Sequence, residues 1–121
     1  MSTKSQESFI KSIKDVENIL SDIGLSHFSL TKKGYATYIK YKGKDETLVT
    51  FMFGPSDWNV EILLEKNKTK YAFKELLQNS SIAQWVRENK FQQKTSDRIK
   101  DEVIWFTDLL RYIYTIRPWT I

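Results

Sequence analysis

The segment DRIKDEVIWFTDLLRYIYTI, residues 97–116, decides how this chain folds. Apolar residues recur in it at alternating steps of three and four, which places them on one side of an α-helix. They form two adjacent rows: Ile99, Val103, Phe106, Leu110 and Ile113, then Trp105, Leu109, Tyr112 and Ile116. Together the rows cover about half of the helix circumference, wider than the usual amphipathic stripe. The segment therefore predicts a long helix, from about Ser96 to Ile116, lying across most of a small core.

A second amphipathic helix is predicted near the start of the chain, from about Lys4 to Ile23. Its apolar row follows the same rhythm: Phe9, Ile13, Val16, Leu20 and Ile23. Thr3 and Gln6 have the spacing of a capping box. Gly24 stands where a left-handed C-terminal cap is expected. These features indicate one continuous helix.

Between the two helices the apolar residues alternate, as they do in half-buried β-strands. Strands are predicted over residues 35–42, 47–53 and 58–65, and a looser segment, 25–31, allows a short edge strand. A four-residue loop after Phe53 would pair that residue with Trp58. The connection near residues 43–45 must contain an odd number of residues, so that the apolar side chains of the strands over 35–42 and 47–53 lie on the same face of the sheet. The pattern is that of an antiparallel meander with one face toward the core.

The remainder of the chain returns to helical spacing, with short helices near residues 73–77 and 81–88. The predicted fold class is therefore α+β: an N-terminal helix, a three- or four-stranded antiparallel β-meander, then three helices. The long C-terminal helix is expected to pack across the sheet. A length of 121 residues suits one domain, so residues 1–121 are expected to form a single domain.

The residues needed for common catalytic chemistry are scarce. The chain has no cysteine and one histidine, His27, which excludes thiol catalysis, cysteine-ligated zinc and the usual histidine triads. Acidic residues of the last helix are interpreted as solubilising charges: Asp97, Asp101, Glu102 and Asp108. We therefore expect no enzyme activity, no cofactor and no bound metal. No apolar run is long enough for a signal peptide or a membrane span, so we expect a cytoplasmic protein without membrane contact.

The outer face of the sheet carries the leading binding hypothesis. Its candidate residues combine apolar and basic side chains: Tyr38, Lys40, Lys42, Leu48, Met52 and Leu63. A sheet with one face in water is not expected to place leucine and methionine there. Either the helices of residues 71–88 cover this face, or a partner does. The prediction is a protein-binding surface with apolar anchors and a lysine rim. Its partner is then another protein, acidic in view of the net charge of +4, or a second copy forming a homodimer.

Small bacterial toxin-neutralising (immunity) proteins are similar in size, in lacking a catalytic set and in having α+β folds of this general kind. That resemblance implies a protein that acts by occluding its partner. The alternative is nucleic-acid binding by the lysine-rich hairpin, whose basic residues are Lys32, Lys33, Lys40, Lys42 and Lys44. Lysines beside aromatic residues on an open sheet are typical of single-strand binding. However, Leu48, Thr50 and Met52 occupy the positions where stacked aromatics would be needed.

Overall fold

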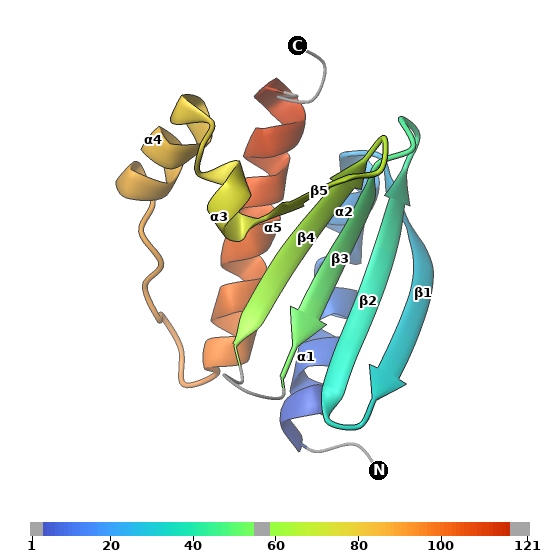
Figure 1. Cartoon of the computed structure of the whole chain (residues 1–121). Helices are drawn as coiled ribbons and strands as arrows, with labels where there is room; N and C mark the ends of the chain where they lie inside the picture. Colours follow the sequence, from blue (N-terminus) through green and yellow to red (C-terminus); the bar gives the residue numbers. More distant parts are fainter. Residues whose placement is uncertain (1–3, 55–58, 117–121) are drawn as a thin grey trace.

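The computed structural model describes residues 4–54 and 59–116 (Figure 1). Its helices are α1 (Lys4–Asp15), α2 (Glu17–Asp22), α3 (Phe73–Leu76), α4 (Ser80–Glu88) and α5 (Arg98–Ile116). Its strands are β1 (Leu25–Lys33), β2 (Ala36–Gly43), β3 (Leu48–Phe53), β4 (Val60–Lys66) and β5 (Thr69–Ala72). The predicted α+β class is confirmed, with a five-stranded antiparallel meander in place of three or four strands. None of the described helices is long and apolar enough to cross a membrane.

The strands follow one another in the order β1-β2-β3-β4-β5, and every neighbouring pair is antiparallel. Lys42 pairs with Leu48, so residues 43–47 form the odd-length connection that the alternation required. The predicted pairing of Phe53 with Trp58 is wrong, because Phe53 pairs with Val60. A shift of two residues leaves every side chain on its predicted face, since the strand repeat is also two. Trp58 itself lies outside the described residues.

Strand β5 was not predicted, because the chain after the strand over residues 58–65 was expected to return to helical spacing. Lys66 instead pairs with Thr69 in a tight hairpin. Its two central residues, Asn67 and Lys68, have φ angles of 53° and 67°. Positive φ at both positions is the mark of a type I′ turn, whose twist matches that of the strands it joins.

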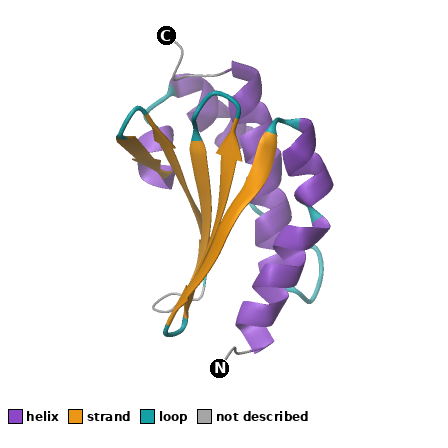
Figure 2. Ribbon diagram, turned by 90° about the vertical axis from the view of Figure 1, so that its right-hand side faces the viewer, coloured by secondary structure: helices purple, strands orange, loops and turns teal. Residues whose placement is uncertain are grey.

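The core lies between the sheet and the helices α1, α2 and α5, which share one face of the sheet (Figure 2). This inner face carries the predicted alternating row, from Thr37 on β2 to Leu64 on β4, and each described member of that row on β2, β3 and β4 is buried. Phe9 of α1 stacks on Phe53 of β3 with ring centroids 5.5 Å apart. The broad apolar face of α5 is confirmed, since Val103 and Leu110 lie fully buried on it. Tyr35, the first residue of the strand predicted over residues 35–42, is 61% exposed and lies in the turn before β2.

The predicted N-terminal helix is interrupted at Val16, whose φ and ψ of −103° and 5° lie outside the α-helical range. The backbone N–H of Val16 donates to the carbonyl of Ile13, a tighter pattern than the α-helical one. Beyond the break, Glu17 accepts a hydrogen bond from the Tyr41 hydroxyl at 2.9 Å. The predicted left-handed cap at Gly24 is confirmed by its φ of 92°. The proposed capping box begins at Thr3, which lies outside the described residues.

Candidate binding surface

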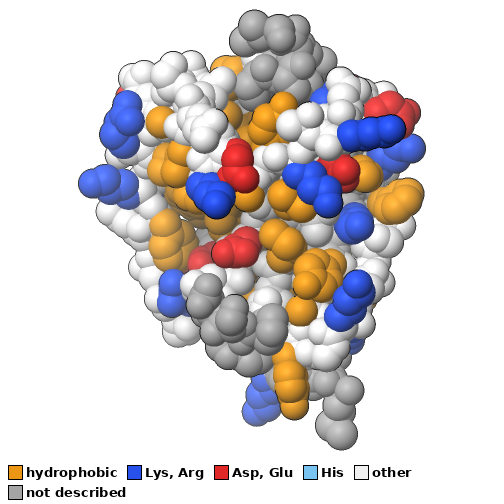
Figure 3. Space-filling model, viewed as in Figure 1, with side chains coloured by type: hydrophobic (Ala, Val, Ile, Leu, Met, Phe, Trp, Pro, Cys, Tyr) orange, Lys and Arg blue, Asp and Glu red, His pale blue; other side chains and the backbone are white. Residues whose placement is uncertain are grey.

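The outer face of the sheet is the side turned away from α1, α2 and α5. No helix lies in front of β1, β2 or β3 on this side (Figure 1). Helices α3 and α4 do not cover these strands, because they pack beside β5 and against α5, where Phe73 and Trp85 both contact Trp105. Figure 3 shows hydrophobic side chains on this face interspersed with lysine and acidic side chains. The outer face of the described sheet is therefore available for a partner.

A shallow depression of about 360 Å³ occupies the middle of this face. Four of the six predicted binding residues line it: Tyr38, Lys40, Met52 and Leu63. The strand register explains their convergence. Tyr38 pairs with Met52, and Thr50 pairs with Lys40 on one side and with Leu63 on the other. The depression thus joins side chains that are distant in sequence but adjacent across the sheet.

The other two predicted residues lie on the same face but do not line the depression. Lys42 and Leu48 pair with one another nearer the β2–β3 turn. Leu48 is half-buried. The Lys42 ammonium lies 3.4 Å from the Glu46 carboxylate, an exposed ion pair that contributes little to stability.

Edge strands also supply lining residues, of which only Lys33 had been named from the sequence, as part of the nucleic-acid hypothesis. They are Thr31 and Lys33 of β1 and Lys70 of β5, together with Glu65 of β4. The sequence feature that could have predicted Lys70 as a lining residue is the Asn67–Lys68 turn, because this turn places β5 next to β4. Lys33, Lys40 and Lys70 outnumber Glu65 around the depression, which gives it an excess of positive charge. The depression therefore combines apolar side chains, Met52 and Leu63, with basic ones.

The five lysines of the nucleic-acid hypothesis do not form one patch. Lys32 pairs with Thr37, whose side chain lies on the buried inner face. Lys44 follows the far end of β2, so that roughly 23 Å of strand separates it from Lys32. Only Lys33 and Lys40 of this set line the depression, where Tyr38 is the single aromatic residue.

A second hollow, of about 440 Å³, lies between α4, α5 and the connector that follows α4. Its floor includes Trp85 and Trp105, with ring centroids 5.8 Å apart, and Trp105 donates its indole N–H to the Asn89 carbonyl. Phe91, the single apolar residue of the connector, packs edge-on against Trp105. The sequence pattern did not predict this hollow, because it depends on how the connector folds back over α5.

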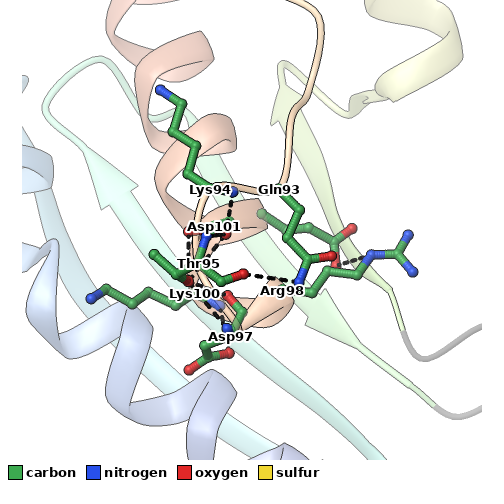
Figure 4. Close-up of polar contacts among 8 residues, drawn as sticks. Gln93, Lys94, Thr95, Asp97, Arg98, Lys100 and Asp101 are labelled. Atoms are coloured by element: carbon green, nitrogen blue, oxygen red, sulfur yellow. Dashed lines mark hydrogen bonds and ion pairs between the residues drawn. The ribbon is translucent and has the colours of Figure 1, made fainter.

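Asp101 holds that connector against α5 (Figure 4). Its carboxylate accepts the backbone N–H groups of Thr95 at 2.7 Å and Lys94 at 2.8 Å. The Thr95 N–H makes the largest contribution in holding the pKa of Asp101 below its usual range. Asp97 caps the helix, because its Oδ1 accepts the N–H of Lys100 at 3.1 Å. The interpretation of Asp101 as a solubilising charge is therefore wrong, and its carboxylate is engaged in holding the backbone.

The neighbouring Glu102 is also buried, although it too was interpreted as a solubilising charge. Burial raises its pKa, and the Arg98 guanidinium and the Val60 backbone N–H offset part of that effect. Among the described residues, no three histidine, cysteine or acidic side chains gather in a way that could hold a metal ion. His27 packs edge-on against Tyr41, with ring centroids 5.5 Å apart.

Comparisons of the chain with protein-family models, with curated proteins and with solved structures found no match. The argument for function therefore rests on the surface described above.

Proposed function

We propose that this chain is a non-enzymatic protein-binding domain that uses the outer face of its sheet to occlude an acidic protein partner. The observation that supports this proposal is the open outer face of β2, β3 and β4. It carries Met52 and Leu63 around a depression rimmed by lysines. A sheet that simply faced water would carry polar side chains at these central positions.

The charge of the surface supports the choice of partner. Lys33, Lys40 and Lys70 surround the apolar centre, and the whole chain carries a net charge of +4. Such a rim speeds encounter with an acidic surface and disfavours basic partners. In its narrower form the proposal is a cytoplasmic, bacterial, toxin-neutralising role, in which the outer face covers the working surface of an acidic toxin.

The test compares the wild-type chain with a Leu48→Glu/Met52→Glu variant. Each protein is immobilised and exposed to bacterial lysate, and any retained protein is identified, purified and titrated by calorimetry. We expect one acidic protein that binds the wild-type chain at one-to-one stoichiometry. The variant should bind it at least roughly tenfold more weakly, because two charges replace apolar contacts at the centre of the interface.

Ile104→Glu is the matched control, because Ile104 is an exposed apolar residue on α5, away from the sheet. It should bind the partner as the wild type does, and circular dichroism should show that all three proteins are folded. Equal affinity of the folded double variant would refute the proposed surface. Failure to retain any protein that binds one-to-one would refute protein binding.

A labelled 20-nucleotide single strand of DNA tests the alternative function in the same series. Nucleic-acid binding predicts an anisotropy change at low salt that disappears steeply as salt rises. It also predicts a weaker signal for Lys40→Glu than for Lys44→Glu, since Lys40 lines the depression and Lys44 does not. That result would favour a nucleic-acid partner over a protein partner.

A further inference from the structure

The floor of the outer depression is a polar side chain. Thr50 lies between Leu48 and Met52 on the outer face of β3, and it lines the depression. Thr50 is 6% exposed, whereas the other lining residues are half-buried or exposed. Its neighbours therefore form the sides of the depression, and a threonine occupies the position most fully removed from water.

The Thr50 hydroxyl is a hydrogen-bonding group that the rest of the fold does not use. No hydrogen bond within the described part of the chain involves it. Its oxygen is also not among the side-chain atoms that are both sealed from water and unpaired, so it opens into the depression. Buried polar side chains are hydrogen-bonded in the great majority of cases, and an unpaired one costs free energy. The geometry at Thr50 is that of a donor whose partner comes from outside the described residues.

Lys40 supplies a second donor at the same place. Thr50 pairs with Lys40 on β2 and with Leu63 on β4. Side chains directly opposite one another on antiparallel strands have Cβ atoms about 5 Å apart, so the long Lys40 side chain reaches the space above Thr50. The Lys40 ammonium forms no ion pair with a described carboxylate. A hydroxyl and an ammonium therefore face the same space, and Met52 and Leu63 form its apolar walls.

The charges of the outer face leave a small positive excess around this space. The strands contribute four lysines, Lys33, Lys40, Lys42 and Lys70, and two glutamates, Glu61 and Glu65. A third glutamate, Glu46, forms the ion pair with Lys42. Lys40 is directly opposite Thr50, whereas Glu61 and Glu65 are its diagonal neighbours, about 7 Å away. Four lysines against three glutamates leave room for one negative charge and not for a polyanion.

We infer that Thr50 and Lys40 bind a single carboxylate, the side chain of one aspartate or glutamate of the acidic partner. This inference rests on the proposed function and names the group that anchors it. One carboxylate oxygen accepts from the Thr50 hydroxyl and the other accepts from the Lys40 ammonium. The methylene part of the acidic side chain contacts Met52 and Leu63. Charge-assisted hydrogen bonds enclosed by apolar side chains give an interface its strongest anchors. A phosphate carries more oxygens and more charge than these donors match.

The stability of the free protein gives the first test. Thr50→Val keeps the branched shape of the side chain and removes its hydroxyl. This variant should be at least as stable as the wild type in urea unfolding, because the hydroxyl has no internal partner to lose. A clear fall in its unfolding midpoint would show that the hydroxyl is already used within the fold, and would overturn the inference.

A peptide titration gives the second test. The probe is acetyl-Ser-Leu-Glu-Leu-Ser-amide, and its matched control carries Gln in place of Glu. Backbone amide shifts of the isotope-labelled full chain are followed by NMR in roughly 0.15 M salt, which screens general attraction to lysines. The Glu peptide should give saturable shifts centred on residues 40, 50 and 63. The Gln peptide should bind at least roughly tenfold more weakly, because it lacks the charge.

Variants then assign the binding to the hydroxyl. Thr50→Val should lower the affinity for the Glu peptide by roughly tenfold, and Thr50→Ser should restore most of that loss. Thr69→Val is the control, because it removes a threonine hydroxyl from β5 outside the depression. Equal affinity of Thr50→Val and the wild type, or equal affinity for the Glu and Gln peptides, would overturn the inference. Tighter binding of a phosphoserine peptide would do the same, since it would assign the centre to phosphate.

The two proposals can fail separately. If lysate yields an acidic partner whose affinity is unchanged in Thr50→Val, the carboxylate anchor is wrong and the protein-binding surface stands. If the Glu peptide binds at Thr50 but no protein is retained from lysate, the carboxylate site stands and the protein-binding role is wrong.

Discussion

Two adjacent residues of α5 show how differently buried carboxylates can behave. Asp101 is surrounded by N–H donors from Lys94 and Thr95, which stabilise its charged form. Glu102 loses water without gaining equivalent donors, and the Arg98 guanidinium is 3.7 Å away. The pKa of Asp101 is therefore lowered, whereas burial raises the pKa of Glu102. The two side chains should affect stability in opposite directions at neutral pH.

Glu102→Gln should stabilise the protein at pH 7, because it removes a charge that the folded state disfavours. A raised carboxyl pKa favours folding below the unfolded value, about pH 4.3, and this benefit is lost as pH rises through the folded value. The gain should be small, roughly 1 kcal/mol or less, because the Arg98 guanidinium and the Val60 backbone N–H already offset part of the cost of burying the charge. Urea unfolding at pH 7 and pH 4 measures it, and the advantage of the variant should shrink at pH 4.

Asp101→Asn is the opposing control. A lowered carboxyl pKa contributes stability that is present above the unfolded value, about pH 3.9, and is lost as pH falls through the folded value. This variant should therefore be less stable at pH 7 and approach the wild type in stronger acid. Hydrogen exchange at the Lys94 and Thr95 amides should quicken at least roughly tenfold. If both variants shift stability in the same direction at pH 7, the opposite roles of the two carboxylates are wrong.

The sequence could not distinguish these two residues. Both are acidic, both lie in the early part of a predicted helix, and such positions are usually exposed and favoured by the helix dipole. What separates them is the path of residues 89–97, which have no periodic pattern. The opposite pKa shifts of Asp101 and Glu102 therefore depend on the path of the connector, which only the folded structure defines.

At the scale of elements, the long and strongly patterned segments were predicted well. The α5 helix and strands β2, β3 and β4 were each placed within about two residues, which is the usual uncertainty of element boundaries. The missed β5 has four residues, too few for its alternation to be recognised. The break at Val16 was missed because the apolar row continues on both sides of it. Short elements and breaks are set by tertiary packing, which a local pattern does not record.

Lys68→Gly should stabilise the β4–β5 hairpin. Lys68 has a φ of 67°, a conformation that costs an L-residue energy and glycine almost none. The substitution creates the Asn-Gly pair preferred in type I′ turns. Greater freedom of glycine in the unfolded chain offsets part of the gain, so we expect roughly 0.5 kcal/mol, measured by urea unfolding.

Lys68→Ala is the control for the loss of the lysine side chain. Alanine keeps the Cβ atom that makes positive φ unfavourable, so this variant should gain no stability. If the alanine variant were as stable as the glycine variant, the gain would arise from removing a charge rather than from relieving the turn.

At the scale of the whole molecule, the sheet separates a buried layer from an open one. Leu63 and Leu64 are neighbours in β4 and show the separation directly, since Leu64 is 1% exposed while Leu63 lines the outer depression. Leu64→Ala should cost about 2–5 kcal/mol of unfolding free energy, because it leaves a cavity in the core. Leu63→Ala should cost less than about 1 kcal/mol. Equal losses in chemical denaturation would show that the outer face is as important for folding as the core.

The same alternation explains how much of the candidate site the sequence could predict. The alternation of side chains along each strand assigned six residues to one face: Tyr38, Lys40, Lys42, Leu48, Met52 and Leu63. Four of them line the depression. This alternation could not show that α3 and α4 pack beside the sheet rather than on it. It also could not supply Lys70, because that residue depends on a strand that was not predicted. The sequence was enough to predict which residues share the outer face. Which residues border the depression could be determined only from the three-dimensional arrangement.

The packing of α5 on the inner face of the sheet has a consequence for biosynthesis. Each strand pairs with its neighbour along the chain, so successive hairpins can form as the polypeptide leaves the ribosome. Helices α1 and α2 cover only part of the inner face of those hairpins, and the rest stays exposed until α5 emerges with Val103, Leu109, Leu110 and Ile113 of the core. Nascent chains that stall before α5 will therefore expose an apolar, aggregation-prone sheet face, and chaperones should bind these chains.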